Sequence, residues 1–491
     1  MQIASHEWLP ASQGNDSSLM EPALAQARSF NHAALYKKLV DTRPATPSRA
    51  EAVAFLRGQL AQIRDQPCEI PEAAEDLGLW MVAASQTVHS RYGQYLLQRK
   101  AGAPRRFFSN RAHALNFLRC VAPTKLVDGA WLYGLLEHWR NPRFSDLVRT
   151  YVEELGEGAP DKNHVLVYRR LLARYGLDPL DDLPDGWYRQ GLIQLALGWN
   201  AEAFLPEIIG FNLAYEQLPL HLPITSYELN ELGLDPYYFT LHVTVDNGDT
   251  GHARRACQAV LDTLPRLDDG GAFWRRVREG SKLACTGVGT TQVIQEFDID
   301  AEVLRILARK SGVGNGAHSD YCRVAGRSVN DWLSMPENIP AFVRALEQGG
   351  WIRRGEPVDN SRFWKLLQGE RADMFGVFSS YELQVIHDWI RGPASCDGQP
   401  YAEFGAPVDV GAPSRQRSFR VAQRLAERDA PPQTSVAPQL LDPDLSLLQD
   451  QLQNLDAADR NSLLIQVMSP VQHWTPAGLY ATRLFVQALC G

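Results

Sequence analysis

Histidine and carboxylate side chains gather most densely at residues 242–252, which read His-Val-Thr-Val-Asp-Asn-Gly-Asp-Thr-Gly-His. His242 and Asp246 are four residues apart, so on an α-helix they project from one face, about 40° apart around the axis. An imidazole and a carboxylate placed in this way can bind one or two metal ions. Mixed nitrogen and oxygen ligands suit iron or manganese better than calcium. The segment therefore predicts a contribution to a metal site.

Two residues compete to be the next ligand along this segment. On an unbroken helix Asp249 lies about 20° from the face of His242, whereas His252 lies about 80° from it. However, Gly248 and Gly251 weaken the helix by up to about 1 kcal/mol each relative to alanine, and a bulged turn would bring His252 back to the site. We expect His252 to be the ligand and keep Asp249 as its alternative.

Two further segments offer metal-binding groups. Residues 153–168 read Glu-Glu-Leu-Gly-Glu-Gly-Ala-Pro-Asp-Lys-Asn-His-Val-Leu-Val-Tyr, and the two glycines and the proline prevent one straight helix. We therefore expect Glu154 to end one helical segment and His164 to begin the next, so that a bent element supplies a carboxylate and an imidazole. In residues 205–216, Glu207 lies on an apolar stripe, where a carboxylate is costly to bury unless it is paired or bound to metal.

Each of these residues also has a purely structural interpretation. His242 could be a buried histidine bonded to the backbone. Glu154 could be a surface charge at a helix end, with Asn163 capping the helix that follows. Glu207 could be a first-turn acid stabilised by the helix dipole. There would be no metal site only if all of these structural interpretations were true at once. The residues taken together therefore favour metal binding.

The order of these residues resembles that of the heme-oxygenase-like diiron oxidases and oxygenases, a group of iron-containing redox enzymes. The shared features are a Glu followed ten residues later by a His, a second Glu, and a His-x-x-x-Asp followed closely by a His, over roughly residues 80–300. The resemblance implies a helical bundle in which three carboxylates and three histidines bind two Fe(II) ions. It assigns Glu154, His164 and His242 to one iron, and Glu207, Asp246 and His252 to the other.

The resemblance also implies the chemistry. Dioxygen would be the co-substrate, and an external electron donor would be needed because no flavin or nicotinamide motif is present. The substrate would be a small metabolite, an amino acid or a derivative, and we favour N-oxygenation in secondary-metabolite biosynthesis. The alternatives are desaturation, C–C cleavage or oxidative decarboxylation at the same site, oxidation with heme or without a cofactor on the same fold, and a non-catalytic helical protein that binds a ligand or metal. A ferritin-like plan is disfavoured because no Glu stands three residues before any of the 12 histidines.

The elements that must position these residues are predicted to be helical. The chain has 491 residues, more than one hydrophobic core usually supports. Apolar residues recur three and four apart, as in residues 129–140, and alternating strand patterns are scarce, so we expect an all-α protein. We predict an N-terminal helical extension (1–79), a heme-oxygenase-like diiron domain (80–305), a helical extension (306–395), a proline-rich irregular connection (396–440) and a C-terminal helical segment (441–491).

The composition of the chain argues against several classes of binding partner and cofactor. The net charge of −8 gives no electrostatic reason to expect nucleic acid. The seven cysteines contain no Cys-x-x-Cys, which argues against zinc-ribbon, iron–sulfur and disulfide-framework proteins. The sequence has neither an apolar run of about 18 residues nor a secretory signal, so we expect no membrane span and a cytoplasmic location. A homodimer is one option for assembly. The glycine-rich stretches 287–291 and 312–316 lack a preceding strand and are expected to be loops rather than nucleotide cradles.

Overall fold

The computed structural model describes residues 30–177, 183–245, 251–267, 270–319, 321–368, 373–392 and 442–490. Within these ranges the regular structure is almost entirely helical. Strand is confined there to one short antiparallel pair, β1 (Arg323–Val324) and β2 (Arg327–Ser328). The predicted all-α class is therefore confirmed. No helix in the described ranges is long and apolar enough to cross a membrane.

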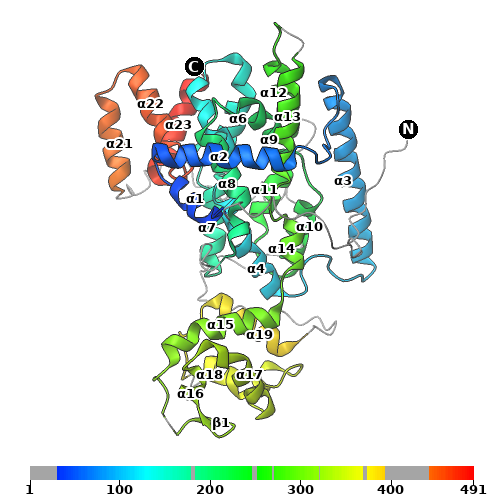
Figure 1. Ribbon diagram of the computed structural model, residues 1–491, viewed down its shortest axis with the longest axis vertical. Coiled ribbons are helices and arrows are strands. Elements are labelled where there is room, and N and C mark those ends of the chain that lie inside the picture. The colour runs from blue at the N-terminus through cyan, green and yellow to red at the C-terminus, as the bar shows by residue number, and fades with distance from the viewer. Residues whose placement is uncertain are drawn as a thin grey trace, which may run out of the picture.

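The N-terminal and central helices form the upper body in Figure 1. They are α1 (His32–Leu39), α2 (Thr46–Ile63), α3 (Leu77–Lys100), α4 (Arg111–Cys120), α5 (Ala122–Lys125), α6 (Ser145–Glu154), α7 (His164–Arg174), α8 (Arg189–Trp199), α9 (Leu205–Tyr215), α10 (His221–Glu231), α11 (Tyr237–Val245), α12 (His252–Thr263), α13 (Gly271–Ala284) and α14 (Thr290–Gln295). Short 3₁₀ helices connect them: η1 (Ala74–Asp76), η2 (Ala130–His138), η3 (Pro142–Phe144), η4 (Gly156–Gly158) and η5 (Asp185–Tyr188).

Two further groups of helices attach to this body. The lower lobe in Figure 1 contains the two strands with α15 (Ile299–Gly314), α16 (Val329–Leu333), η6 (Pro336–Asn338), α17 (Ile339–Gln348), η7 (Val358–Asn360), α18 (Arg362–Gln368) and α19 (Ser380–Arg391). The C-terminal helices, orange to red in Figure 1, are α21 (Pro443–Gln453), α22 (Ala457–Val467) and α23 (Pro476–Cys490). The expected proline-rich connection, 396–440, lies outside the described residues, and the predicted segment boundaries stay predictions.

Two apolar cores hold these groups together. The first core takes buried residues from α1, α2, η2, α6, α8, α9, α12, α13 and the C-terminal helices. The second takes them from α4, α7, α10, α11 and the lower lobe. Trp131 is fully buried in the first core and Tyr168 in the second. Consecutive helices α6 and α7 therefore belong to different cores, and so do α11 and α12, which brings the ends of these helices to the boundary between the cores.

Helix α9 packs closely against α13 through glycine. A Cβ atom at Gly210 would lie 1.8 Å from the carbonyl oxygen of Val277, and one at Gly280 would lie 2.2 Å from the carbonyl oxygen of Glu207. Only glycine lets the two backbones approach this far without displacement. The close contact fixes the position of α9, whose C-terminal end reaches the boundary between the cores.

Candidate metal centre

The bend between α6 and α7 places Glu154 and His164 side by side. Glu154 is the last residue of α6 and His164 the first residue of α7, as the sequence predicts. Gly156 makes the bend possible, because it has a φ of +63° and a Cβ atom there would lie 2.4 Å from the backbone nitrogen of Asn163. Asn163 then caps α7 by accepting a 2.9 Å hydrogen bond from the backbone N–H of Leu166.

A first group of buried ligand atoms forms around this bend. It consists of Asp128, Glu154, His164 and His242, whose ligand atoms all lie within 4.8 Å of one another. His242 comes from α11, and its ring centroid lies 4.4 Å from that of His164. The structure thus brings together all three residues that the resemblance assigned to one iron, and it adds Asp128 from the turn between α5 and η2.

The side chains of His164 and Glu154 are in close contact without a well-aligned hydrogen bond between them. Nδ1 of His164 lies 2.5 Å from Oε2 of Glu154, yet this buried nitrogen has no aligned hydrogen-bond partner. Burial opposes charge on the imidazole, but the carboxylate of Glu154 raises the pKa of His164 above its usual value. The pKa of Glu154 is held well below its usual range, against the effect of burial, by His164 and His252. A cation beside these two atoms would satisfy both.

His242 is oriented for metal binding by the backbone. Its Nδ1 donates a 2.9 Å hydrogen bond to the carbonyl oxygen of Tyr238, so in the neutral ring the lone pair is on Nε2. That nitrogen lies 3.1 Å from Oδ2 of Asp128, which also accepts a 2.5 Å hydrogen bond from the Tyr238 hydroxyl. Although burial opposes ionisation, Lys125 and His242 lower the pKa of Asp128. A lone pair and a carboxylate that face each other require a proton or a cation between them.

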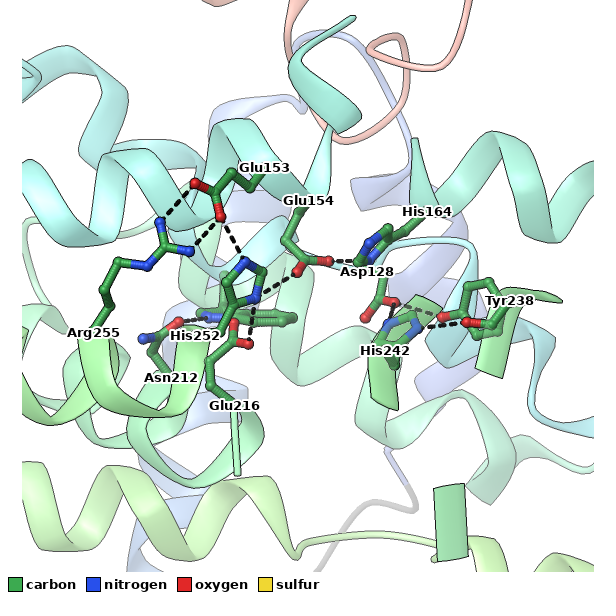
Figure 2. A network of polar contacts seen from close by, with 11 residues as sticks. Asp128, Glu153, Glu154, His164, Asn212, Glu216, Tyr238, His242, His252 and Arg255 are labelled. Carbon is green, nitrogen blue, oxygen red and sulfur yellow. Dashed lines mark hydrogen bonds and ion pairs between the residues drawn. The ribbon is translucent and has the colours of Figure 1, made fainter. Parts of the chain in front are cut away.

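A second group of buried ligand atoms lies next to the first and consists of Glu154, Glu216 and His252 (Figure 2). His252 is the first residue of α12. Its Nδ1 lies 3.0 Å from Oε2 of Glu216 and 3.3 Å from Oε1 of Glu154. Its Nε2 lies 3.0 Å from Oε2 of Glu153, which Arg255 holds in an ion pair. A carboxylate behind the second nitrogen is typical of metal-bound histidine, because it fixes the ring orientation.

Glu154 belongs to both groups. Its Oε2 faces His164 in the first group and its Oε1 faces His252 in the second, as Figure 2 shows. One carboxylate is therefore placed to bridge two cations.

The donor set fits iron. Across the two groups, three carboxylates and three imidazoles are gathered, all of them buried. Burial raises the pKa of Glu216, and the charge on His252 only partly opposes this. Taking so many ionisable groups out of water is costly unless cations compensate them. Mixed carboxylate and imidazole ligands in a helical bundle suit iron or manganese.

Comparison with known families agrees with this chemistry. Residues 115–284 match a family described as iron-containing redox enzymes. Both ligand groups lie inside the matched residues, and the helical structure agrees with the heme-oxygenase-like fold predicted for them. No curated protein and no solved structure matches the chain.

Glu207, predicted as a ligand, is not brought to either of the two ligand groups. It lies in the first turn of α9, where its carboxylate accepts hydrogen bonds of 2.6 and 2.7 Å from Arg276. Glu216 stands nine residues later, at the C-terminal end of the same helix, and joins the second ligand group instead. Nine residues are a rotation of about 180° around a helix, so the two acids face opposite sides. The interpretation of Glu207 as a first-turn acid is the one that the structure supports.

Asp246 and its neighbour Asp249 lie outside the described residues, so their assignment as ligands stays a prediction. His252, the residue preferred over Asp249, does reach the site, because α12 starts at His252 rather than continuing from α11.

Asp128 and Glu216 join the ligand groups although the sequence does not single them out as ligands. Asp128 follows Leu126 and Val127 and precedes Gly129, so it is a lone acid after an apolar stretch, the same signal that drew attention to Glu207. Gly129 has a φ of +79°, and a Cβ atom there would lie 3.0 Å from the Cβ atom of Glu154. Because Gly129 lacks a Cβ atom, the turn that carries Asp128 can approach α6 at Glu154.

A cavity of about 290 Å³ opens beside the ligand groups. Asp128, Glu154, Glu216 and His242 line it on the metal-binding side. The lining also includes the loop 285–289, between α13 and α14. The glycine-rich part of this loop was expected to be an ordinary loop, and the structure places it at the cavity.

The C-terminal segment packs against the bend between α6 and α7. Asn163 donates a 3.0 Å hydrogen bond to Nδ1 of the buried His473, and a Cβ atom at Gly158 would lie 2.4 Å from the carbonyl oxygen of Leu479. The guanidinium of Arg169 lies 3.8 Å from the ring centroid of Trp474. Residues more than 300 positions away from the bend thus hold it in place.

Proposed function

We propose that this chain is a non-heme diiron enzyme that uses dioxygen to oxidise a small organic molecule. The observation that carries the proposal is the position of Glu154, whose two oxygens face histidines of two adjoining ligand groups. A carboxylate shared in this way can serve as a ligand of two metal ions at once. The similarity of residues 115–284 to a family of iron-containing redox enzymes supports the same chemistry.

The protein would hold the two ions with separate sets of side chains. Asp128, His164 and His242 would bind one iron, Glu216 and His252 the other, and Glu154 both. Two Fe(II) ions bound there supply the electrons and Lewis acidity with which dioxygen is activated.

Other residues prepare these ligands for binding. The carbonyl of Tyr238 accepts the hydrogen bond of Nδ1 of His242, so that Nε2 would bind the metal. Glu153 accepts the hydrogen bond of Nε2 of His252, so that Nδ1 would bind the metal. The surrounding cores exclude bulk water, which strengthens the interaction of each carboxylate with a cation.

The substrate would occupy the adjoining cavity. Its size suits a small metabolite such as an amino acid or a derivative, and N-oxygenation is the reaction we propose first. Desaturation, C–C cleavage and oxidative decarboxylation are alternatives at the same metal centre. An external electron donor would supply the electrons that each turnover requires.

The reaction can be tested with isotopic oxygen. Protein loaded anaerobically with Fe(II) is mixed with a chemical reductant and a panel of amino acids under ¹⁸O₂, and products are identified by mass spectrometry. We expect an amino-acid product that carries ¹⁸O on nitrogen. A dehydrogenated or shortened product without that label would support an alternative reaction. Oxygen uptake no greater than that of zinc-loaded protein, with no product, would contradict the proposed function.

A further inference from the structure

Helix α3 is anchored to the upper body at its two ends, and its middle part is poorly covered. At the N-terminal end Leu77 and Met81 are buried. At the C-terminal end Tyr95 is buried, and its hydroxyl donates a 2.8 Å hydrogen bond to Glu228 of α10. All of α3 belongs to the described residues, and no side chain between Met81 and Tyr95 is buried. Figure 1 shows the helix at the outer edge of the upper body.

The first part of α3 carries no charge. Residues 77–90 read Leu-Gly-Leu-Trp-Met-Val-Ala-Ala-Ser-Gln-Thr-Val-His-Ser, which is about four helical turns without Asp, Glu, Lys or Arg. The solvent-facing side of a surface helix normally carries charged and polar residues. A helix with apolar residues on its packed side and on its exposed side is expected to have neighbours on both sides.

The exposed uncharged residues share one face of α3. A stripe about 100° wide around the axis contains Leu79, Val82, Ala83, Gln86, Ser90, Gly93 and Leu97, all of them exposed. The two leucines at its ends are large apolar side chains left mostly in water, since Leu79 is 77% and Leu97 is 70% exposed. A Cβ atom at Gly93 would meet nothing within 4 Å, so the space beside the helix is open there. We call this face the α3 stripe.

The two ends of α3 carry opposite charges. Glu75 and Asp76, both exposed, lie directly before the helix. Lys100 is its last residue, and the exposed Arg106 follows in the next segment. Two copies of α3 packed antiparallel would place each acidic end beside a basic end, whereas parallel packing would place like charges together. The antiparallel arrangement also opposes the two helix dipoles.

We propose that the chain forms a two-fold symmetric dimer in which the α3 stripes of two copies pack antiparallel. When Leu79 lies level with Leu97 of the second copy, Asp76 lies level with Lys100, because each charged residue stands three positions outside its leucine. A two-fold axis requires such a self-complementary surface. The small residues Ala83 and Gly93 near the middle of the stripe allow the helices to approach closely.

The size of the stripe sets the expected strength of the dimer. Leu79 and Leu97 are 18 residues apart, so the stripe is about 27 Å long and one helix wide. That is at the small end of specific protein interfaces, so we expect a dissociation constant in the micromolar range.

Sedimentation equilibrium of the full-length protein tests the association. At physiological salt and between about 1 and 100 μM, we expect a reversible equilibrium of monomer and dimer. Leu79→Glu should weaken the dimer at least about tenfold, because it buries a carboxylate against Leu97 of the second copy. Leu267→Glu, at an exposed leucine outside α3, is the matched control and should dimerise as the unchanged protein does. Circular dichroism first establishes that each variant is folded.

A charge exchange tests the antiparallel register. Asp76→Lys and Lys100→Glu should each weaken the dimer, because each places like charges at both ends of the pair. An equimolar mixture of the two variants should dimerise as tightly as the unchanged protein, because each variant then supplies the charge that the other needs.

Three results would overturn the proposed dimer. The first is a chain that stays monomeric at about 100 μM, whether hydrogen exchange then shows the α3 stripe covered by another part of the same chain or open to solvent. The second is a dimer that Leu79→Glu does not weaken. The third is a mixture of the charge variants that associates no more tightly than its components. None of these measurements involves bound metal, so the dimer and the proposed function are tested separately.

Discussion

Nδ1 of His164 lies 2.5 Å from Oε2 of Glu154 across a bend that only glycine can form, and the nitrogen has no aligned hydrogen bond. The two groups are held there by the ends of two helices that belong to different cores. The fold therefore keeps an imidazole and a carboxylate in contact whether or not they bond to each other. Such enforced contact is expected at a site built for a cation that both groups share.

The choice between the two acids of α9 can be tested directly. Glu216→Gln removes a charged ligand from the second group, so we expect the protein to lose about one of two bound irons. Glu207→Gln only weakens the pair with Arg276, so it should keep both irons. Iron content after anaerobic loading and desalting, measured by plasma mass spectrometry, distinguishes the variants. Loss of iron in Glu207→Gln with full loading of Glu216→Gln would show that the assignment made from the sequence is the better one.

Glu153 is expected to act on the metal through His252. Glu153→Gln removes the negative charge behind Nε2 of His252, so the affinity of the second site should fall by about 10- to 100-fold. Competition with a fluorescent chelator measures this affinity. Glu202→Gln, at an exposed acid between α8 and α9, is the matched control and should have no effect. Equal affinities in both variants would mean that Glu153 has no part in orienting His252.

The contact between the bend and the C-terminal helices predicts an unequal effect of two glycine substitutions. Gly158 and Gly376 both have a φ of +81°, but only at Gly158 would a Cβ atom collide with backbone, 2.4 Å from the carbonyl oxygen of Leu479. Gly376→Ala should cost only the backbone penalty, about 1–2 kcal/mol. Gly158→Ala should cost more and also weaken metal binding, because it displaces α23 from the bend. Chemical denaturation and metal titration measure the two effects, and equal losses would contradict the proposed support.

The loss of stability at acid pH should depend on His113, a buried histidine of α4 that belongs to neither ligand group. Burial lowers its pKa to about 4, although its 2.8 Å hydrogen bond to the carbonyl oxygen of Ile294 opposes the shift. The unfolded chain binds a proton below about pH 6.5 and the folded chain does not, so stability falls as the pH drops from about 6.5 toward 4.

His113→Gln should therefore reduce the loss of unfolding free energy between pH 7 and pH 5 by about 2 kcal/mol. His89→Gln, at an exposed histidine of α3, should leave the loss unchanged. Urea denaturation of the metal-free protein at both pH values provides the comparison. Parallel pH profiles for the two variants would be inconsistent with a neutral, buried His113.

The sequence was sufficient where local chemistry determines structure. Glycines and a proline predicted the bend that separates Glu154 from His164, and helical spacing predicted an all-α chain. Glu207 lies away from the ligand groups for a physical reason: a carboxylate on an apolar helix can be paired by any nearby cation, and here Arg276 of α13 is that cation. Asp128 carries the same sequence signal as Glu207, but that signal cannot show that a turn packed against α6 brings Asp128 to Glu154, 26 residues away in the sequence.

The diiron centre can be tested by counting the irons that each chain binds. Full-length protein is loaded anaerobically with ⁵⁷Fe(II), freed of excess metal, and measured by plasma mass spectrometry and Mössbauer spectroscopy, with His242→Ala as the comparison. We expect about two high-spin ferrous ions per chain in the unchanged protein and a clear loss in His242→Ala. No tightly bound iron, or the same loading in both proteins, would contradict it.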